Sequence, residues 1–345
     1  MKIRIVSEIE EFASYKDQWD AIFNNQGYSF FQSFEFNYYS WKTELSKDKL
    51  NRLCVVLVIN NEVVSSVFPL YIDSKKRLRF INDRHADFCD VLSNDKFDFE
   101  NILSEVRSQL KFGSVHFINL TKDSFLYELY KKNALRNCRL KPFAKYSDLV
   151  ISVGSFPSNV LRYRSKQKTE FRRVKKKNAD KDYQLFLKDD ADFPIIEINQ
   201  LRQRMIELGL RKANFLDENR LLLLNELYIS NRILISMVKK KNDIHAISFI
   251  LKNENEYLFW IDMYDNAKMI NIYNYILFLE NISRDNSVNI SFGRGVYDYK
   301  VANFKPDIKQ LFAIYIYENQ LNLSLFLFFD KIKDILKSIY KKFIK

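Results

Sequence analysis

Side chains that could do chemistry gather in the stretch SFGRGVYDYK, residues 291–300, which holds two of the chain's six glycines. The apolar run that leads into it is typical of a strand. Gly is used where the backbone takes a positive φ or approaches another group closely. Within the stretch, Tyr299 offers a hydroxyl donor, and Lys300 offers a positive charge near a developing oxyanion or a phosphate. The pattern suits a functional loop or an ordinary turn, and both readings stay open.

A second pair of reactive groups ends the aromatic run FWIDMYD, residues 259–265. If this run is a strand, alternation places Asp262 and Tyr264 on one face and Met263 and Asp265 on the other. A carboxylate can accept a proton or orient a substrate, but only one of the two Asp can face a given cleft. Asp265 could instead cap the helix expected to begin near INIYNYIL.

Covalent catalysis and metal binding have no support in the sequence. The chain has no serine-elbow motif and no Cys/His pair, and its Cys and His residues are widely spaced without a metal-ligand or disulfide pattern. We expect buried thiols and packing or surface histidines at Cys54, Cys89, Cys138, His85, His116 and His245.

The composition indicates a folded protein of two domains. The chain has 345 residues, of which 47% are hydrophobic, with 30 Phe, 20 Tyr and only 6 Gly and 5 Pro. Its first residues, MKIRIVSEIEEF, carry charges where a signal peptide has an apolar core, and no run approaches about 18 apolar residues. These features predict a cytoplasmic protein.

The net charge of +12 is concentrated in two segments. Residues 162–177 hold nine Lys or Arg and one Glu, and residues 331–345 hold six Lys and one Asp. A nearly neutral remainder argues against a broad nucleic-acid-binding face. The first segment predicts a docked basic helix whose outer face is either solvated or bound to an anionic carrier or nucleotide. Its narrow apolar seam is Val160, Tyr163, Phe171 and Val174.

The same order of elements occurs twice along the chain. In each half, helices precede three β-branched runs joined by polar turns, the signature of an antiparallel meander, and a helix and strands follow. The Gly, Pro and Ser of VGSFPSN predict a boundary near residue 155. The closing strand of the second half is expected at QLFAIYIY.

The last segment, residues 323–345, predicts a basic amphipathic helix. This helix suits docking on its own domain or lying on an anionic membrane surface, and both readings stay open. Its apolar arc is Leu325, Phe328, Phe329, Ile332, Leu336, Ile339 and Phe343, and Lys331, Lys333, Lys337, Lys341, Lys342 and Lys345 lie opposite.

With these elements in order, the sequence resembles the GNAT acyltransferase superfamily. Within it, the chain is similar to the two-domain cellulose-biosynthesis acetyltransferase-like proteins, relatives of the Fem-type peptidoglycan aminoacyltransferases. The resemblance rests on Trp19, FFQSFEF and Trp41, on ADFCD with Asp87 and Asp90, on the basic helix SKQKTEFRRVKKK, on Asp265 in MYDN, and on SFGRGVYDYKVANF.

The resemblance implies an α+β fold of two tandem GNAT-like domains with mixed, largely antiparallel sheets flanked by helices. The expected domains are 1–155, 156–322 with the catalytic cleft loop, and the helix 323–345. It implies catalytic roles for Asp265, Tyr299 and Lys300. Substrate contacts are expected at Trp41, Asp87, Asp90, Arg294 and Gly295, and cofactor contacts at Asn271, Tyr273 and Asn274.

The implied activity is an N-acyltransferase that moves an acyl group from a thioester such as acyl-CoA or acetyl-CoA. The implied acceptor is a nucleotide- or lipid-linked amino sugar of cell-envelope polysaccharide biosynthesis, and no metal is needed. Two alternatives remain: a Fem-like transferase that uses aminoacyl-tRNA, and a non-catalytic membrane-surface or assembly protein with this fold. The expected place of action is the cytoplasm, with peripheral contact at the inner face of the membrane through residues 323–345.

Overall fold

The chain forms two compact units in a computed structural model that describes residues 2–24, 27–254 and 256–343. Unit 1 comprises Met1–Trp41, Leu45–Phe143 and Gln310–Lys345, and unit 2 comprises Lys42–Glu44 and Ala144–Lys309. The division after Phe143 differs from the boundary expected near residue 155. The reason is that strand β7 continues through this stretch without a break, from Cys138 to Ile151.

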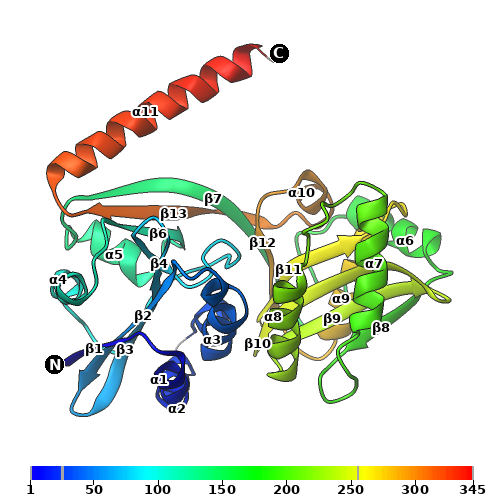
Figure 1. The fold of residues 1–345 in the computed structure, drawn as a ribbon. Coiled ribbons are helices and arrows are strands. Elements are labelled where there is room, and N and C mark those ends of the chain that lie inside the picture. Colours follow the sequence, from blue (N-terminus) through cyan, green and yellow to red (C-terminus); the bar gives the residue numbers. More distant parts are fainter. Residues whose placement is uncertain (1, 25–26, 255, 344–345) are drawn as a thin grey trace. The chain divides into compact units, whose positions relative to one another are not determined.

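Unit 1 is built on a mixed sheet with the strand order β1-β2-β3-β4-β6-β13, and β5 pairs with β3 (Figure 1). The predicted meander is confirmed, because β2, β3 and β4 pair antiparallel in sequence, whereas β4 and β6 pair parallel. The elements are β1 (Lys2–Val6), α1 (Ile9–Ser14), α2 (Lys16–Phe23), α3 (Phe34–Thr43), β2 (Arg52–Asn60), β3 (Val63–Ile72), β4 (Arg77–Phe80), β5 (Leu92–Ser93), α4 (Phe99–Gln109), β6 (Ser114–Leu120) and α5 (Phe125–Lys131).

The last strand and the last helix belong to unit 1. Strand β13 (Asp307–Tyr317) pairs antiparallel with β6 along Phe312–Tyr317, and helix α11 (Gln320–Phe343) follows it. The expected closing strand of a second, repeated domain therefore completes the first unit's sheet instead. Local propensity could identify the strand but could not identify its partner, because the pairing joins segments far apart in the sequence.

Unit 2 has the strand order β7-β12-β11-β10-β9-β8. Strands β9, β10 and β11 form the second predicted antiparallel meander. Helices α6 and α9 pack on one face of this sheet, and α7 and α8 lie over the other (Figure 1). The elements are α6 (Ser165–Lys177), β8 (Asp182–Phe186), α7 (Ile195–Glu207), α8 (Glu218–Ile229), β9 (Ile233–Lys240), β10 (Asp243–Asn253), β11 (Glu256–Tyr264), α9 (Ile270–Ile282), β12 (Val288–Arg294) and α10 (Asp298–Phe304).

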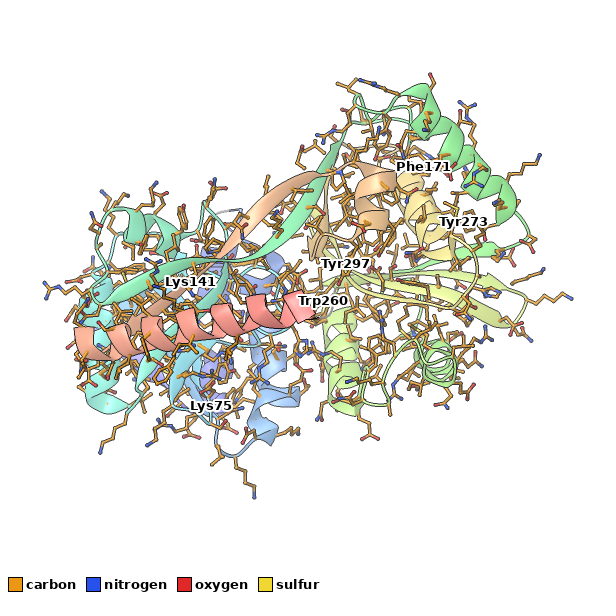
Figure 2. The ribbon with its side chains drawn as sticks, turned by 90° about the horizontal axis from the view of Figure 1, so that it is seen from above. Lys75, Lys141, Phe171, Trp260, Tyr273 and Tyr297 are labelled. Carbon is orange, nitrogen blue, oxygen red and sulfur yellow. The ribbon has the colours of Figure 1, made fainter. Side chains whose placement is uncertain are left out.

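An aromatic core fills the α6/α9 face of unit 2. Phe171 of α6 and Tyr273 of α9 both lie in it (Figure 2). The whole predicted seam of the basic segment is buried, as expected, although Val160 and Tyr163 precede the helix itself. The cationic side chains of α6 therefore remain on its outer side.

Strands β11 and β12 diverge after a short parallel pairing. They pair only over Glu256–Leu258 and Asn289–Ser291, and beyond Ser291 the register of β12 against β7 is also broken up to Arg294. The end of β12 thus leaves backbone groups without ladder partners, and other groups of unit 2 must satisfy them. The candidate site is built around this divergence.

Candidate functional site

Four side chains from three elements of unit 2 form a buried polar group, which we call the Asp262 cluster: Asp262, Tyr275, Tyr299 and Lys300. Tyr275 donates a hydrogen bond to Oδ2 of Asp262, and Ser248 donates to Oδ1 at 2.8 Å. The Lys300 ammonium lies 3.5 Å from the same Oδ2. Strand β11, helix α9 and helix α10 therefore bring a carboxylate, phenols and an ammonium together.

Lys300 is 4% exposed, which is unusual for a lysine. Its Nζ donates to the backbone oxygen of Phe292 at 2.9 Å, close to where β12 has parted from β11. Phe292 has no register partner in β11 or β7, so the ammonium supplies a donor for its carbonyl. The Asp262 carboxylate offsets the cost of burying the ammonium charge. An ammonium has three donors, so a further acceptor could bind to it.

The two phenols of the cluster stay protonated at neutral pH. Burial, followed by the Asp262 charge, raises the pKa of Tyr275 well above its ordinary value. The same two causes raise the pKa of Tyr299. The Tyr299 side chain is hydrogen-bonded to those of Tyr275 and Asn271. Both phenols therefore serve as hydroxyl groups and not as bases.

The expected glycine-marked loop is largely regular structure. Strand β12 runs through Arg294, and helix α10 begins at Asp298, so Tyr299 and Lys300 lie on a helix. The short connection explains one glycine. Gly295 has a φ of +99°, and a Cβ there would lie 3.1 Å from the Tyr297 ring.

The Tyr297 ring covers the Lys300 ammonium. Nζ lies 5.5 Å from the centre of this ring, which also stacks on Tyr299 at 6.1 Å. Tyr297 itself is 54% exposed and is labelled in Figure 2. A side chain at position 295 would be strained by this φ and would press on the ring, so a glycine here helps Tyr297 to cover Lys300.

Asp265 lies on the opposite face of the sheet from Asp262, as alternation predicts. Its Oδ2 lies 2.7 Å from Nδ1 of His245 and 3.5 Å from Nη1 of Arg204 on α7. Asp262, by contrast, is hydrogen-bonded to Tyr275 on α9. Its Oδ1 accepts from the backbone N–H of Ala267. Arg204 also lines a surface hollow of about 720 Å³ beside α7. The structure therefore brings Asp262, which the sequence argument passed over, and not Asp265, to Tyr299 and Lys300.

The residues expected to contact a cofactor occupy the first turns of α9. Asn271 accepts from the N–H of Ile272 at 2.9 Å, and Tyr273 packs in the core. Asn274 is fully buried and donates to Oγ of Ser248 at 3.1 Å. No described residue is a partner for its Oδ1. Asn271 and Asn274 thus support the Asp262 cluster, through Tyr299 and Ser248 respectively.

Three cationic side chains gather near the start of α9. The residue before the helix, Met269, has a φ of +62° and gives no side-chain cap, and Arg173 of α6 lies 3.7 Å from its sulfur. The neighbouring charges of Arg173 and Lys268 lower the pKa of Lys177. Glu170 already binds the Arg173 guanidinium. The positive charge that remains, beside the positive end of a helix dipole, favours an anion.

The three site residues expected in unit 1 have packing partners. Trp41 is 7% exposed and lies against Tyr71 in the core. Asp90 accepts from the N–H groups of Phe125 and Leu126 at the start of α5, and burial raises its pKa to about 7. Asp87 is buried as well.

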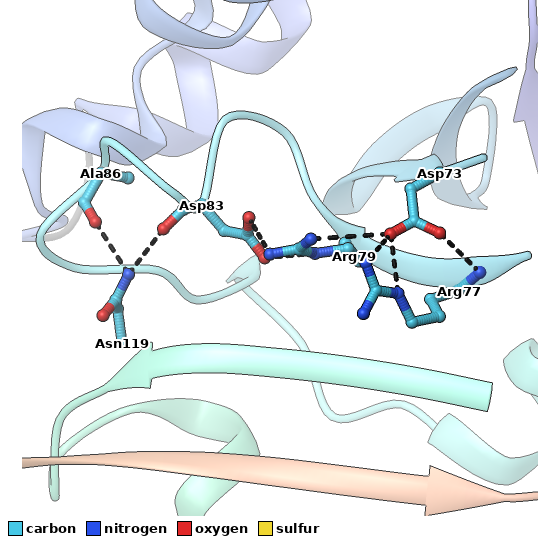
Figure 3. A network of polar contacts seen from close by, with 6 residues as sticks. All are labelled: Asp73, Arg77, Arg79, Asp83, Ala86 and Asn119. Atoms are coloured by element: carbon cyan, nitrogen blue, oxygen red, sulfur yellow. Dashed lines mark hydrogen bonds and ion pairs between the residues drawn. The ribbon is translucent and has the colours of Figure 1, made fainter. Parts of the chain in front are cut away.

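A buried ion network holds the segment that carries Asp87 and Asp90 (Figure 3). Arg79 binds both oxygens of Asp83 at 2.9 and 2.7 Å, and Asp73 binds Arg77. The Asn119 amide donates to the backbone oxygens of Asp83 and Ala86, each at 2.8 Å. This network fixes the backbone between β4 and β5.

The described part of the chain contains neither a cluster of metal ligands nor a helix that could span a membrane. Among the side chains that the structure describes, no three of His, Cys, Asp or Glu are arranged to hold a metal ion. In the same residues, no helix combines the length and the apolar character needed to cross a bilayer. Cys54 and Cys89 are buried and Cys138 is half-buried, and all three are free thiols.

Comparison with solved structures defines the fold as GNAT-like. FemX matches with a TM-score of 0.61 and 10% identity, over 94% of this chain and 99% of that one. A tandem GNAT protein from the clavulanic acid biosynthesis pathway matches with a TM-score of 0.50 and 7% identity, over 91% of this chain and 97% of that one.

A third similar structure is the C-terminal domain of a protein assigned as a lysylphosphatidylglycerol synthetase from Agrobacterium fabrum. It has a TM-score of 0.59 and 10% identity, over 92% of this chain and 96% of that one. No family model matches the sequence, and no curated protein matches it either. The chain therefore shares an α+β, GNAT-like fold with these proteins. At sequence identities this low, the similarity shows a common fold and does not show a common function.

Proposed function

We propose that this chain is an acyltransferase that transfers an acyl group from a thioester to an amine at the Asp262 cluster. The observation that carries the proposal is the buried Lys300 ammonium at the point where β11 and β12 diverge. Acyl transfer develops negative charge on the carbonyl oxygen, and a fixed cation in a site with little water stabilises that charge strongly.

In the proposed reaction, the neutral amine attacks the carbonyl carbon while Lys300 donates to the oxyanion. The carbon–nitrogen bond forms, the carbon–sulfur bond breaks, the amine releases its proton to solvent, and the leaving thiolate takes a proton from solvent. Asp262 and Tyr275 hold the ammonium in place, and Tyr299 adds a hydroxyl donor. The exposed Tyr297 ring is the group that the substrates displace.

The cationic cluster of Arg173, Lys177 and Lys268 would bind the donor's phosphate. The first N–H groups of α9 are largely occupied, since those of Ile270 and Tyr273 donate to backbone oxygens. The guanidinium and ammonium groups would therefore supply most of the hydrogen bonds to the anion. Phosphates of acyl-CoA or acetyl-CoA fit this chemistry.

The acceptor we propose is an amino sugar carried on a nucleotide or a lipid, in cell-envelope polysaccharide biosynthesis. Support for a carrier of this kind comes from the resemblance of the sequence and from the cationic outer side of α6. The phosphate backbone of an aminoacyl-tRNA could bind to the same cations. Because the fold is similar to that of FemX, the test below also includes an aminoacyl-tRNA donor.

The test is a transfer assay with purified protein, a series of acyl-CoA donors and nucleotide-linked amino sugars. Free thiol release that depends on both substrates, and an N-acylated product by mass spectrometry, would support the proposal. Transfer from aminoacyl-tRNA, without transfer from any thioester, would show that the donor is an aminoacyl-tRNA and not a thioester. Absence of transfer from both donors, with the fold intact, would favour the non-catalytic alternative.

A further inference from the structure

Helix α11 is attached to unit 1 by the face that carries Leu323 and Phe326. Leu323 is 5% exposed. The Phe326 ring packs against Tyr315 at 5.0 Å and Tyr317 at 5.2 Å, both on β13, and the Lys141 ammonium lies 5.8 Å from its centre. The first turns of α11 therefore continue the packing of β13.

The predicted apolar arc of α11 points away from this attachment. At about 100° per residue, the arc is about 100° wide, and Leu323 lies almost opposite its centre. The predicted arc residues that the structure describes are far from buried: Leu325 is 48% exposed, Phe328 60%, Phe329 64%, Ile332 38% and Leu336 60%. Leu321, which precedes the predicted helix, falls on the same arc and is 69% exposed. The arc is therefore not the surface that docks the helix on its own unit.

Contiguous exposed apolar side chains usually mark a surface that another body covers. The segment of residues 320–345 carries six Lys and two Asp, a net charge of +4. Lys331 is exposed in the structure. The side chains of the arc residues Ile339 and Phe343 lie outside the described part of the chain, as do those of Lys333, Lys337, Lys341 and Lys342 and all of Lys345. With the helical repeat expected from the sequence, none of these lysines falls on the arc.

An anionic lipid surface complements both properties of α11. Aromatic and aliphatic groups on one side and lysines on the other are the pattern of helices that lie in the membrane interface, and each lysine near an anionic surface adds to binding. A second copy of this helix would match the arc but would bring another net charge of +4 close to the first. The charge thus favours lipid over a copy of the chain.

We propose that α11 binds the surface of an anionic bilayer, with the arc from Leu321 to Leu336 inserted between the lipid headgroups and the lysines at headgroup level. The helix lies in the plane of the surface, because its apolar side chains are confined to one arc. Binding is reversible and weakens with salt, because the lysine contribution is screened.

The experiment compares the full chain and two variants in co-sedimentation with vesicles of phosphatidylcholine, with and without phosphatidylglycerol. The arc variant is Leu325→Ser/Phe328→Ser/Phe329→Ser. The control, Leu222→Ser/Ile229→Ser, removes two exposed apolar groups from α8, at 52% and 50%, against three on the arc at 48%, 60% and 64%. All the changed side chains are exposed, so the thermal midpoint should stay the same.

The expected result is binding to the phosphatidylglycerol vesicles at low salt, at least about tenfold weaker for the arc variant and unchanged for the control. Equal binding by the arc variant, or no binding by the unchanged chain at low salt, overturns the proposal. A dimer in sedimentation that the arc variant abolishes, without vesicle binding, assigns the arc to a second copy instead.

Discussion

The variant Lys300→Met tests two roles of the Lys300 ammonium, the structural role described in this paragraph and the proposed role as donor to the oxyanion. The variant removes the donor to the Phe292 carbonyl and the cation beside Asp262, but keeps a flexible apolar chain of similar length. A buried carbonyl without its partner costs about 1–3 kcal/mol, and Asp262 loses its cation as well. We therefore expect a thermal midpoint lower by several degrees in a folded protein.

The chemical role has a separate readout. If Lys300 donates to the oxyanion, turnover should fall at least tenfold, which is about 1.4 kcal/mol of transition-state stabilisation, with a smaller effect on KM. The assay is thiol release with saturating donor and acceptor, at a temperature where circular dichroism shows the variant folded. Lys188→Met, on an exposed surface segment, is the matched control and should change neither quantity.

The outcomes distinguish catalysis from structure. A lower midpoint with unchanged turnover would make Lys300 a structural group that merely satisfies Phe292, and would refute the proposed oxyanion role. Unchanged midpoint and turnover together would contradict the geometry on which both roles depend.

Four further predictions follow from neighbouring features. Asp262→Asn should lower turnover more than Asp265→Asn, since only Asp262 contacts Lys300; the reverse order in the thiol assay would return the proton-acceptor role to Asp265. Arg173→Ala and Lys268→Ala should each raise the KM for the donor severalfold and leave kcat unchanged, whereas the control Arg172→Ala should change neither. If the KM for the donor is the same in all three variants as in the unchanged chain, the cationic cluster does not bind the donor. Gly295→Ala should lower the thermal midpoint because of its φ and the Tyr297 ring, unlike Gly113→Ala, whose Cβ meets only a backbone oxygen at 4.0 Å; equal midpoints would contradict this account. Burial raises the pKa of Asp90 from 3.8 to about 7, so between these pH values the folded state holds a proton that the unfolded state has lost. The free energy of unfolding should therefore fall as pH rises from about 4 to 7. Chemical denaturation across this range should show a shallower fall for Asp90→Asn, and the same pH profile for both proteins would refute the shift.

Periodicity predicted the local elements well. The two meanders and the helices of FENILSEVRSQL and SKQKTEFRRVKKK follow directly from β-branched runs and from apolar residues at helical spacing. Alternation also placed Asp262 and Asp265 on opposite faces correctly. These features depend on residues that are close together in the sequence, so the pattern of a single sequence is enough to predict them.

Features that depend on distant partners were missed. The sequence offers no sign that β13 joins β6, or that Lys300 is buried and donates to the Phe292 carbonyl. Choosing between Asp262 and Asp265 required knowing which face of β11 the helix α10 reaches. The turn-like residues of SFGRGVYDYK concealed helix α10, because Gly295 and Tyr297 suggested that the loop continued.

The division of unit 1 between early and late segments has a consequence for its synthesis. The ribosome delivers residues 45–143 well before Gln310–Tyr317, and all of Ala144–Lys309 emerges between them. Until β13 arrives, strand β6 is paired only with β4, and the edge that β13 later covers stays open, which is a surface prone to aggregation. Unit 2, whose long segment is contiguous, can complete its sheet first, so the first unit to emerge is the last to finish folding.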